Sequence, residues 1–217
     1  MSNVVAVTGD LVGSRQVDAQ TVEAAFALLK QASDEISLWF AATDTHFTRY
    51  RGDGWQIYLS RAGYGLRGAV YIIARLRAGG MAISTRAAVG IGTAESLGTD
   101  SLADARGTAF EAAGQALDTM NKTQRLAIQG TEVTAFQRII VELIDERIGR
   151  WSREQAEAIA LYLHPDNPTL ADLSQALGIS TQAVSYRLSG AGASVLRRSL
   201  RIWENAFDRT AHAGDQP

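Results

Sequence analysis

Two aspartates stand where a strand would end in a glycine-rich turn. Asp10 follows the apolar run Val4–Val7, and Asp53 lies between Gly52 and Gly54. Two carboxylates held together at the edge of a sheet form a hard-oxygen site that suits Mg²⁺ and nucleotide phosphates. For either aspartate alone, the ordinary interpretation is a turn residue that bonds the nearby backbone. The two together, at matching places in the chain, favour a metal or phosphate site.

The elements that would position these aspartates follow the order βαββαβ. The spacing of apolar residues predicts strands over 3–10, 47–51, 55–59 and 83–91, and helices over 18–40 and 66–76. This order is the split βαβ unit of a ferredoxin-like fold. In its antiparallel sheet, of strand order 4-1-3-2, the end of the first strand and the hairpin turn lie at one edge, so Asp10 and Asp53 are expected to be neighbours.

Beyond this unit we expect a helix over 102–120, a short strand over 125–129 and a helix over 133–148. Ser152 and Gln155 fit a capping box that opens a new helix, which indicates a domain boundary just before them. The predicted fold class is therefore α+β, with a ferredoxin-like palm domain over 1–149, a small all-α domain over 150–209 and a polar tail over 210–217.

The composition limits the classes of function. The net charge is −2, so binding to nucleic acid would need a local basic patch. Cysteine is absent, which excludes disulfides, thiolate catalysis and cysteine-bound zinc, and the histidines lack metal-ligand spacing. No apolar run approaches the ~18 residues that span a bilayer, and the N-terminus lacks the pattern of a signal peptide. We therefore expect a cytoplasmic protein.

Three segments together resemble the class III nucleotidyl cyclases. Asp10–Ser14 resembles the Asp-Ile-Val-Gly turn of that family, and Arg49–Trp55 resembles its Lys-x-x-Gly-Asp-x-Phe hairpin. Asp104–Glu111 resembles its Asp-x-x-Gly-x-x-Val-Asn segment. The short Gly-Asp hairpin and the chain length are also similar to the SatD family, small bacterial proteins built on this scaffold. The resemblance covers residues 3–120 and implies a cyclase-like palm fold.

The resemblance implies roles for individual residues. Asp10 and Asp53 would hold Mg²⁺, and Asp104 matches the aspartate with which the family reads the base. Arg49 stands in place of the base-reading lysine, and because a guanidinium does not replace an ammonium, the choice of purine is left open. Backbone N–H groups at a helix start favour phosphate on physical grounds too. The residues that would cradle the phosphates are Leu11, Val12, Gly13 and Ser14.

The catalytic pair of the family is replaced in this chain. Its transition-state asparagine and arginine fall on Glu111 and Gln115. An arginine that neutralises developing phosphate charge contributes several powers of ten in rate, and glutamine cannot supply that charge. We therefore expect nucleotide binding without a cyclic product and assign no catalytic residue, although the question of an enzyme stays open. The arginines that would substitute for the missing one are Arg15, Arg51, Arg86 and Arg106.

The segment 169–188 predicts a helix-turn-helix. Thr169 is a plausible N-cap of a first short helix, Gly178 supplies the turn, and Ser180 caps a second helix. The segment resembles the recognition half of bacterial winged-helix regulators and the C-terminal module of sigma factors. The alternative is a generic helical hairpin, because the same residues also satisfy ordinary packing.

Local charge supports DNA binding by this module. No Asp or Glu occurs between Leu173 and Trp203, whereas four arginines do. Polar residues on the exposed side of the second helix would contact base edges. The predicted DNA-binding residues are Thr181, Gln182, Ser185, Tyr186, Arg187, Arg197, Arg198 and Arg201.

The leading hypothesis from the sequence is a DNA-binding transcriptional regulator whose degenerate cyclase-like domain senses a nucleotide with Mg²⁺. The expected partners are duplex DNA, a purine or cyclic nucleotide, and a second copy of the chain, because operators are read as half-sites. One alternative is an active nucleotidyl cyclase or nucleotidyltransferase. The other is a catalytically dead palm domain that serves only for dimerisation.

Overall fold

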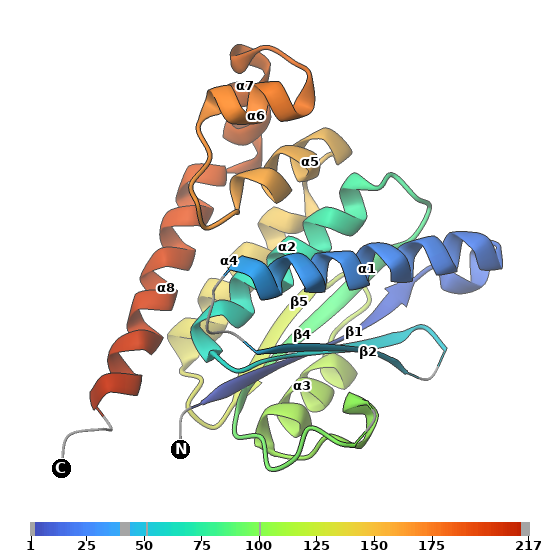
Figure 1. The fold of residues 1–217 in the computed structure, drawn as a ribbon, viewed down its shortest axis with the longest axis vertical. Helices are drawn as coiled ribbons and strands as arrows, with labels where there is room; N and C mark the ends of the chain where they lie inside the picture. The colour runs from blue at the N-terminus through green and yellow to red at the C-terminus, as the bar shows by residue number, and fades with distance from the viewer. Residues whose placement is uncertain (1–2, 40–43, 51, 100, 214–217) are drawn as a thin grey trace.

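A five-stranded sheet of order β2-β3-β1-β4-β5 forms the centre of the computed structural model, which describes residues 3–39, 44–50, 52–99 and 101–213 (Figure 1). The first four strands pair antiparallel, and β5 pairs parallel with β4. The predicted order 4-1-3-2 is confirmed, with β5 added at the β4 edge. The strands are β1 (Val4–Val12), β2 (Thr45–Tyr50), β3 (Gly54–Leu59), β4 (Ser84–Gly92) and β5 (Leu126–Gly130).

Helices cover both faces of this sheet. α1 (Ala19–Trp39) and α2 (Gly65–Ala78) lie over one face, and α3 (Thr108–Thr119) lies over the other (Figure 1). Alternate residues of a strand point to opposite faces. Val5 and Val7 of β1 accordingly pack with α1 and α2, whereas its even-numbered residues pack on the α3 side. Asp10 is therefore on the α3 face.

The predicted helix over 102–120 is wrong at its start. The structure has a 3₁₀ turn, η3 (Leu102–Asp104), and α3 begins only at Thr108. Gly107 separates the two at a φ of 134°, a region that only glycine adopts readily. A Cβ at this position would also collide with the carbonyl of Thr93. The hydrophobic spacing alone did not reveal this interruption.

Five further helices follow. The predicted capping box of Ser152 and Gln155 is confirmed, and Thr169 and Ser180 cap α6 and α7 as expected. Gly178 ends α6 in the left-handed region, with a φ of 65°. α8 continues to Ala213, beyond the predicted start of the polar tail. The helices are α4 (Ala135–Gly149), α5 (Arg153–Tyr162), α6 (Leu170–Leu177), α7 (Thr181–Ala191) and α8 (Ala193–Ala213).

A buried ion pair fastens α8 to α2. Arg67, only 4% exposed, donates from Nε and Nη2 to the carboxylate of Glu204 at 2.6 and 2.9 Å. Its Nη1 donates to the carbonyl of Leu163 at 2.8 Å. α8 runs along one side of the molecule (Figure 1), and one buried apolar cluster extends from Val5 to Trp203. This cluster crosses the predicted boundary, so the helical part packs firmly on the sheet part.

Helix α4 exposes several apolar side chains among charged ones. Val141, Ile144 and Ile148 are buried, whereas Phe136 and Leu143 are largely exposed.

Within the described part of the chain, no helix is long and apolar enough to cross a membrane.

Candidate metal and nucleotide site

The structure brings Asp10 and Asp53 to the same edge of the sheet. In the pairing of β1 with β3, Asp10 lies opposite Gly54, the residue that follows Asp53. The N–H of Leu11 donates to the carbonyl of Asp53 at 3.0 Å. The hydroxyl of Ser14 donates to the Asp53 carboxylate at 2.9 Å. The neighbourhood expected from the strand order is therefore present.

The carboxylate of Asp10 is already paired with a guanidinium. Arg86 lies opposite Asp10 in the pairing of β1 with β4. Its Nε donates to Oδ1 at 3.0 Å, and its Nη2 donates to Oδ2. The bond to Asp10 raises the pKa of Arg86, and the charges of Asp118 and Asp53 act in the same direction. Arg86 thus serves as the internal counter-ion of this acidic edge.

A buried hydrogen-bond chain fixes the backbone beneath Asp10. Trp55 donates from Nε1 to the hydroxyl of Thr85 at 2.9 Å, and this hydroxyl donates to the Asp10 carbonyl at 2.7 Å. Gly9 makes room for this arrangement, because a Cβ there would collide with the Trp55 ring. The residue before Asp10 must therefore be glycine, and the carboxylate is held on a rigid support.

The donor set suits a hard divalent cation. Asp10 and Asp53 offer two carboxylates from neighbouring positions, and Ser14 adds a hydroxyl. Mg²⁺ is commonly held by one or two carboxylates while it keeps water and takes substrate phosphates as further ligands. No group of three or more His, Cys, Asp or Glu suited to a metal occurs among the described residues. A cation at Asp10 would also have to displace Arg86 from the carboxylate.

The predicted phosphate turn is only partly available. Gly13 has a φ of 89° and precedes the short 3₁₀ helix η1 (Ser14–Gln16). The N–H of Leu11 is used by the Asp53 carbonyl, and Leu11 itself is buried. Val12 pairs with Ser84 in the sheet. Gly13 and Ser14 are therefore the members of this turn that can face a ligand.

Arg49 and Asp104, the two residues predicted to read the base, are not brought together. The guanidinium of Arg49 lies 3.8 Å from the ring centroid of Phe26 in α1. Thr48, the residue before Arg49 in β2, points to the opposite face of the sheet. There its hydroxyl accepts a hydrogen bond from the N–H of Leu102 in η3 at 2.9 Å. Asp104 belongs to η3. Arg49 and Asp104 thus lie on opposite faces of the sheet.

Glu111 and Gln115 lie on the exposed side of α3. They line a cavity of about 560 Å³ together with Arg138 of α4. The amide oxygen of Gln115 accepts a hydrogen bond from Gln129 at 2.8 Å. Arg138 thus brings a guanidinium to this cavity from a different helix. Arg138 was not predicted as a site residue, because α4 lies beyond the segments that resemble cyclases. Arg51, one of the arginines expected to substitute for the missing one, is outside the described residues.

The predicted base-contacting residues share one surface of α7. Thr181, Gln182, Ser185 and Tyr186 are all exposed, and Tyr186 is 71% exposed. We call this surface the α7 face.

The four predicted arginines divide into two pairs. Arg187 forms an ion pair with Glu157 at 2.8 Å. The guanidinium of Arg197 lies 3.7 Å from the ring centroid of Tyr162, and one of its nitrogens is buried. Arg198 and Arg201 are exposed. Of the four predicted arginines, Arg198 and Arg201 are therefore the most accessible.

Comparison with known proteins shows a distant likeness of fold. No protein-family model matches the chain, and no curated protein matches it. The guanylyl cyclase Cya2 is similar over 58% of this chain and 74% of its own, at 12% identity and a TM-score of 0.38. Two structures of a bacterial light-regulated adenylyl cyclase are similar over the same share, at 13% and 12% identity, with TM-scores of 0.37 and 0.35.

These structural neighbours are nucleotidyl cyclases. This chain spans 43% and 42% of the length of the two light-regulated cyclase chains. At such identities the likeness concerns the arrangement of the backbone and assigns no role to any residue.

Proposed function

We propose that this chain is a DNA-binding transcriptional regulator, acting as a homodimer, whose sheet domain binds a nucleotide with Mg²⁺. The DNA-binding part rests on the α7 face. A helix that reads the major groove needs exposed polar groups near its N-terminus. The α7 face has this character, and no carboxylate occurs between Leu173 and Trp203 to repel phosphates.

Arg198 and Arg201 supply the positive charge for the DNA backbone. Both are exposed on α8, and neither forms an ion pair with the described residues. An arginine that neutralises a phosphate releases a counterion, which gives binding a strong dependence on salt. Arg197 is the weaker candidate because it packs on Tyr162.

The pair of Asp10 and Arg86 supports the nucleotide part of the proposal. Mg²⁺ and a nucleotide bring opposite charges to this edge. The cation would take the carboxylates of Asp10 and Asp53, and the released guanidinium of Arg86 would pair with a phosphate. Arginine is well suited to this exchange because it forms strong charge-assisted bonds with both carboxylates and phosphates.

One observation favours a second function, a palm domain used only for dimerisation. The Asp10 carboxylate is satisfied by Arg86, so this edge of the sheet needs no bound cation for its stability. In that case neither Mg²⁺ nor a nucleotide binds. Binding of Mg²⁺ and of a nucleotide, compared between the wild type and Arg86→Ala, separates the two functions.

The DNA proposal is tested by selecting duplexes from a random pool and measuring their affinity at several salt concentrations. We expect Arg198→Ala with Arg201→Ala to weaken binding to all sequences and to reduce the salt slope by about 0.9 per lost phosphate contact. Replacing Gln182 or Ser185 by alanine is expected to change the preferred sequence instead, because base edges carry the specificity. Arg150→Ala, at an exposed arginine after α4, is the matched control.

The oligomeric state is read from the mass of the complex on the selected duplex, for which the proposal expects two chains. If the wild-type protein enriches no sequence and shows no salt-dependent retention of duplex DNA, the regulator proposal fails. The α6–α7 hairpin is then a packing element.

A further inference from the structure

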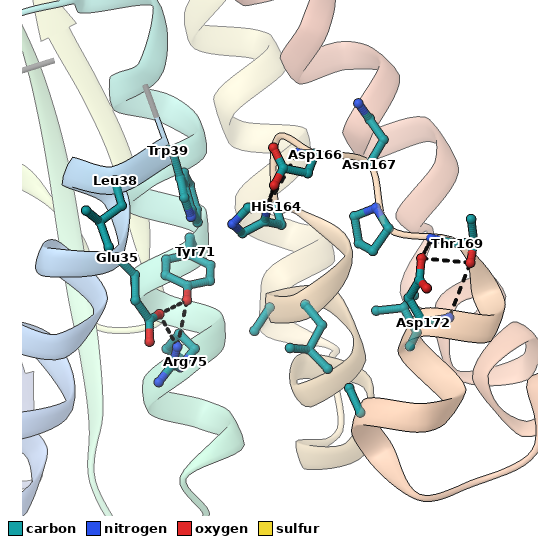
Figure 2. A pocket seen from close by; sticks show the side chains of 15 residues that line it. Glu35, Leu38, Trp39, Tyr71, Arg75, His164, Asp166, Asn167, Thr169 and Asp172 are labelled. Atoms are coloured by element: carbon teal, nitrogen blue, oxygen red, sulfur yellow. Dashed lines mark hydrogen bonds and ion pairs between the residues drawn. The ribbon is translucent and has the colours of Figure 1, made fainter. Parts of the chain in front are cut away.

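A second cavity opens between the sheet domain and the helical part (Figure 2). Its volume of about 640 Å³ is that of a small-molecule pocket, for which the usual range is ~300–1,000 Å³. Leu38, Trp39 and Tyr71 form one wall, and Leu161 and Leu173 belong to the other. No residue of the metal and nucleotide site lines it, so this cavity is a separate feature of the fold.

The walls of the cavity present uncovered apolar surface. Leu38 is 83% exposed and Leu161 is 37% exposed. The Trp39 ring lies edge-on to Tyr71 at 4.5 Å and to His164 at 5.8 Å between ring centroids. Concave apolar surface of this kind is typical of a ligand site. An apolar ligand that binds there removes its own surface and the surface of the cavity wall from water.

A polar group lies on the wall formed by α1 and α2 (Figure 2). The Tyr71 hydroxyl and Nη1 of Arg75 both donate to Oε2 of Glu35. Burial acts to raise the pKa of Glu35, but the bonds from Arg75 and Tyr71 outweigh it and hold that pKa below its usual value. Burial and the bond to Glu35 raise the pKa of Tyr71. At neutral pH the wall therefore presents a carboxylate and a neutral phenol.

This carboxylate has unused acceptor capacity. An ionised carboxylate offers about four acceptor positions. The bonds from Tyr71 and Arg75 share Oε2 of Glu35, and Gln31 donates to Oε1 at 3.1 Å, so Oε1 keeps an acceptor position for a ligand. The Glu35 side chain is 31% exposed, so a ligand can reach it. What binds here must donate hydrogen bonds.

The other titratable groups at the cavity are also mainly acidic. Arg75 is already paired with Glu35, and His164 lies 3.5 Å from the carboxylate of Asp166. Asp172 is the capping partner of Thr169, on the far wall in Figure 2. The lining thus holds three carboxylates, of which Glu35 contacts the one guanidinium, that of Arg75. Because the partly exposed Trp39 ring also lines the cavity, this lining is complementary to a cation, which aromatic faces attract.

We propose that this cavity binds an apolar small molecule that carries one ammonium group. The apolar body lies between the walls of α1 and α6, and the ammonium donates to Glu35 beside the ring of Trp39. The site goes beyond the regulator function proposed above and does not depend on it, since neither DNA nor a nucleotide takes part.

The charge requirement is tested by calorimetric titration of the full chain with three molecules of one shape. These are 4-phenylbenzylamine, 4-phenylbenzyl alcohol and 4-phenylbenzoate. We expect one amine per chain, bound at least about ten-fold more tightly than the alcohol, with the benzoate weakest. Glu35→Gln is expected to weaken the amine about ten-fold and to leave the alcohol unchanged. Asp34→Asn, which removes a charge from the same helix outside the cavity, is the control.

The location is tested by filling the cavity. Ala176 is an exposed lining residue of α6, so Ala176→Trp adds an indole without removing a contact. We expect this variant to lose amine binding, whereas Gln175→Trp, on the same helix outside the lining, keeps it. No saturable binding of the amine, equal affinity for amine and benzoate, or full binding by folded Ala176→Trp overturns the proposal.

Discussion

Arg86 and Asp10 face each other across neighbouring strands, and their pairing sets the charge of the whole sheet edge. The two positions are opposite in the register of β1 and β4, and both point to the α3 face. Under the proposed function, the Arg86 guanidinium must leave the Asp10 carboxylate before a cation can bind there. Whether Asp10 binds a metal therefore depends on how easily Arg86 leaves it.

We predict that Arg86→Ala separates metal binding from nucleotide binding. Mg²⁺ alone should bind about ten-fold more tightly, because a competing positive charge is removed. Mg²⁺-dependent binding of ATP or GTP should weaken about ten-fold or more, because a charge-assisted bond to phosphate is lost. Calorimetry with the metal alone, and then with each nucleotide, measures both changes.

Arg150→Ala is the control for this experiment, because Arg150 is an exposed arginine that pairs with Glu146 and belongs to no predicted nucleotide site. Asp10→Ala and Asp53→Ala should abolish the Mg²⁺-dependent signal and leave the fold intact, since they create no core cavity. If wild type and all four variants bind neither metal nor nucleotide, the edge is an ion pair of structural value only.

The sequence predicted that Asp10 and Asp53 would be neighbours, because that follows from strand order alone. It did not predict the partner of Asp10, which depends on the register of two strands more than seventy positions apart. Arg49 and Asp104 are separated because successive side chains of β2 point to opposite faces of the sheet. Thr48 contacts η3, which contains Asp104, whereas Arg49 contacts α1 on the other face. A motif match gives positions in the chain and leaves the direction of each side chain unsettled.

At the scale of elements, the caps and turns were predictable because they are local. Thr169, Gly178 and Ser180 each act on residues within a few positions of themselves. The interruption before α3 was not predicted, because Gly107 stands within a sequence of good helix formers and its φ is fixed by close contact with Thr93. The docking of α8 was not predictable either, since Arg67 and Glu204 are 137 positions apart.

We predict that breaking the Arg67–Glu204 pair loosens α8 from α2, because it leaves a buried charge without a partner. Glu204→Ala leaves Arg67 buried without its partner and should lower the free energy of unfolding by about 3–5 kcal/mol. Replacing both residues, as Arg67→Met with Glu204→Leu, should recover most of the loss, because the buried charge is then gone. Urea denaturation measures the three proteins.

Asp34→Ala provides the comparison, because it breaks an exposed pair with Lys30 and should cost no more than about 0.5 kcal/mol. Equal stability of Glu204→Ala and Asp34→Ala would mean that α8 is not anchored at Arg67.

At the scale of the whole molecule, the sheet domain and the helical part share one buried cluster that runs from β1 to α8. The α7 face and the Asp10–Asp53 edge are therefore carried by a continuous packed body. Coupling between two sites needs differential binding to two states of such a body, and it commonly amounts to about 5–150-fold in affinity. A regulator of the proposed kind would use this coupling.

The most direct measurement is the affinity for a selected duplex, by fluorescence anisotropy at fixed salt, with and without Mg²⁺ and ATP or GTP. We predict that one Mg²⁺–nucleotide pair changes this affinity at least about five-fold. Asp53→Ala should still bind the duplex and lose the change. A wild-type protein that binds no duplex, or binds it with one affinity under all these conditions, contradicts the proposal of a nucleotide-sensing regulator.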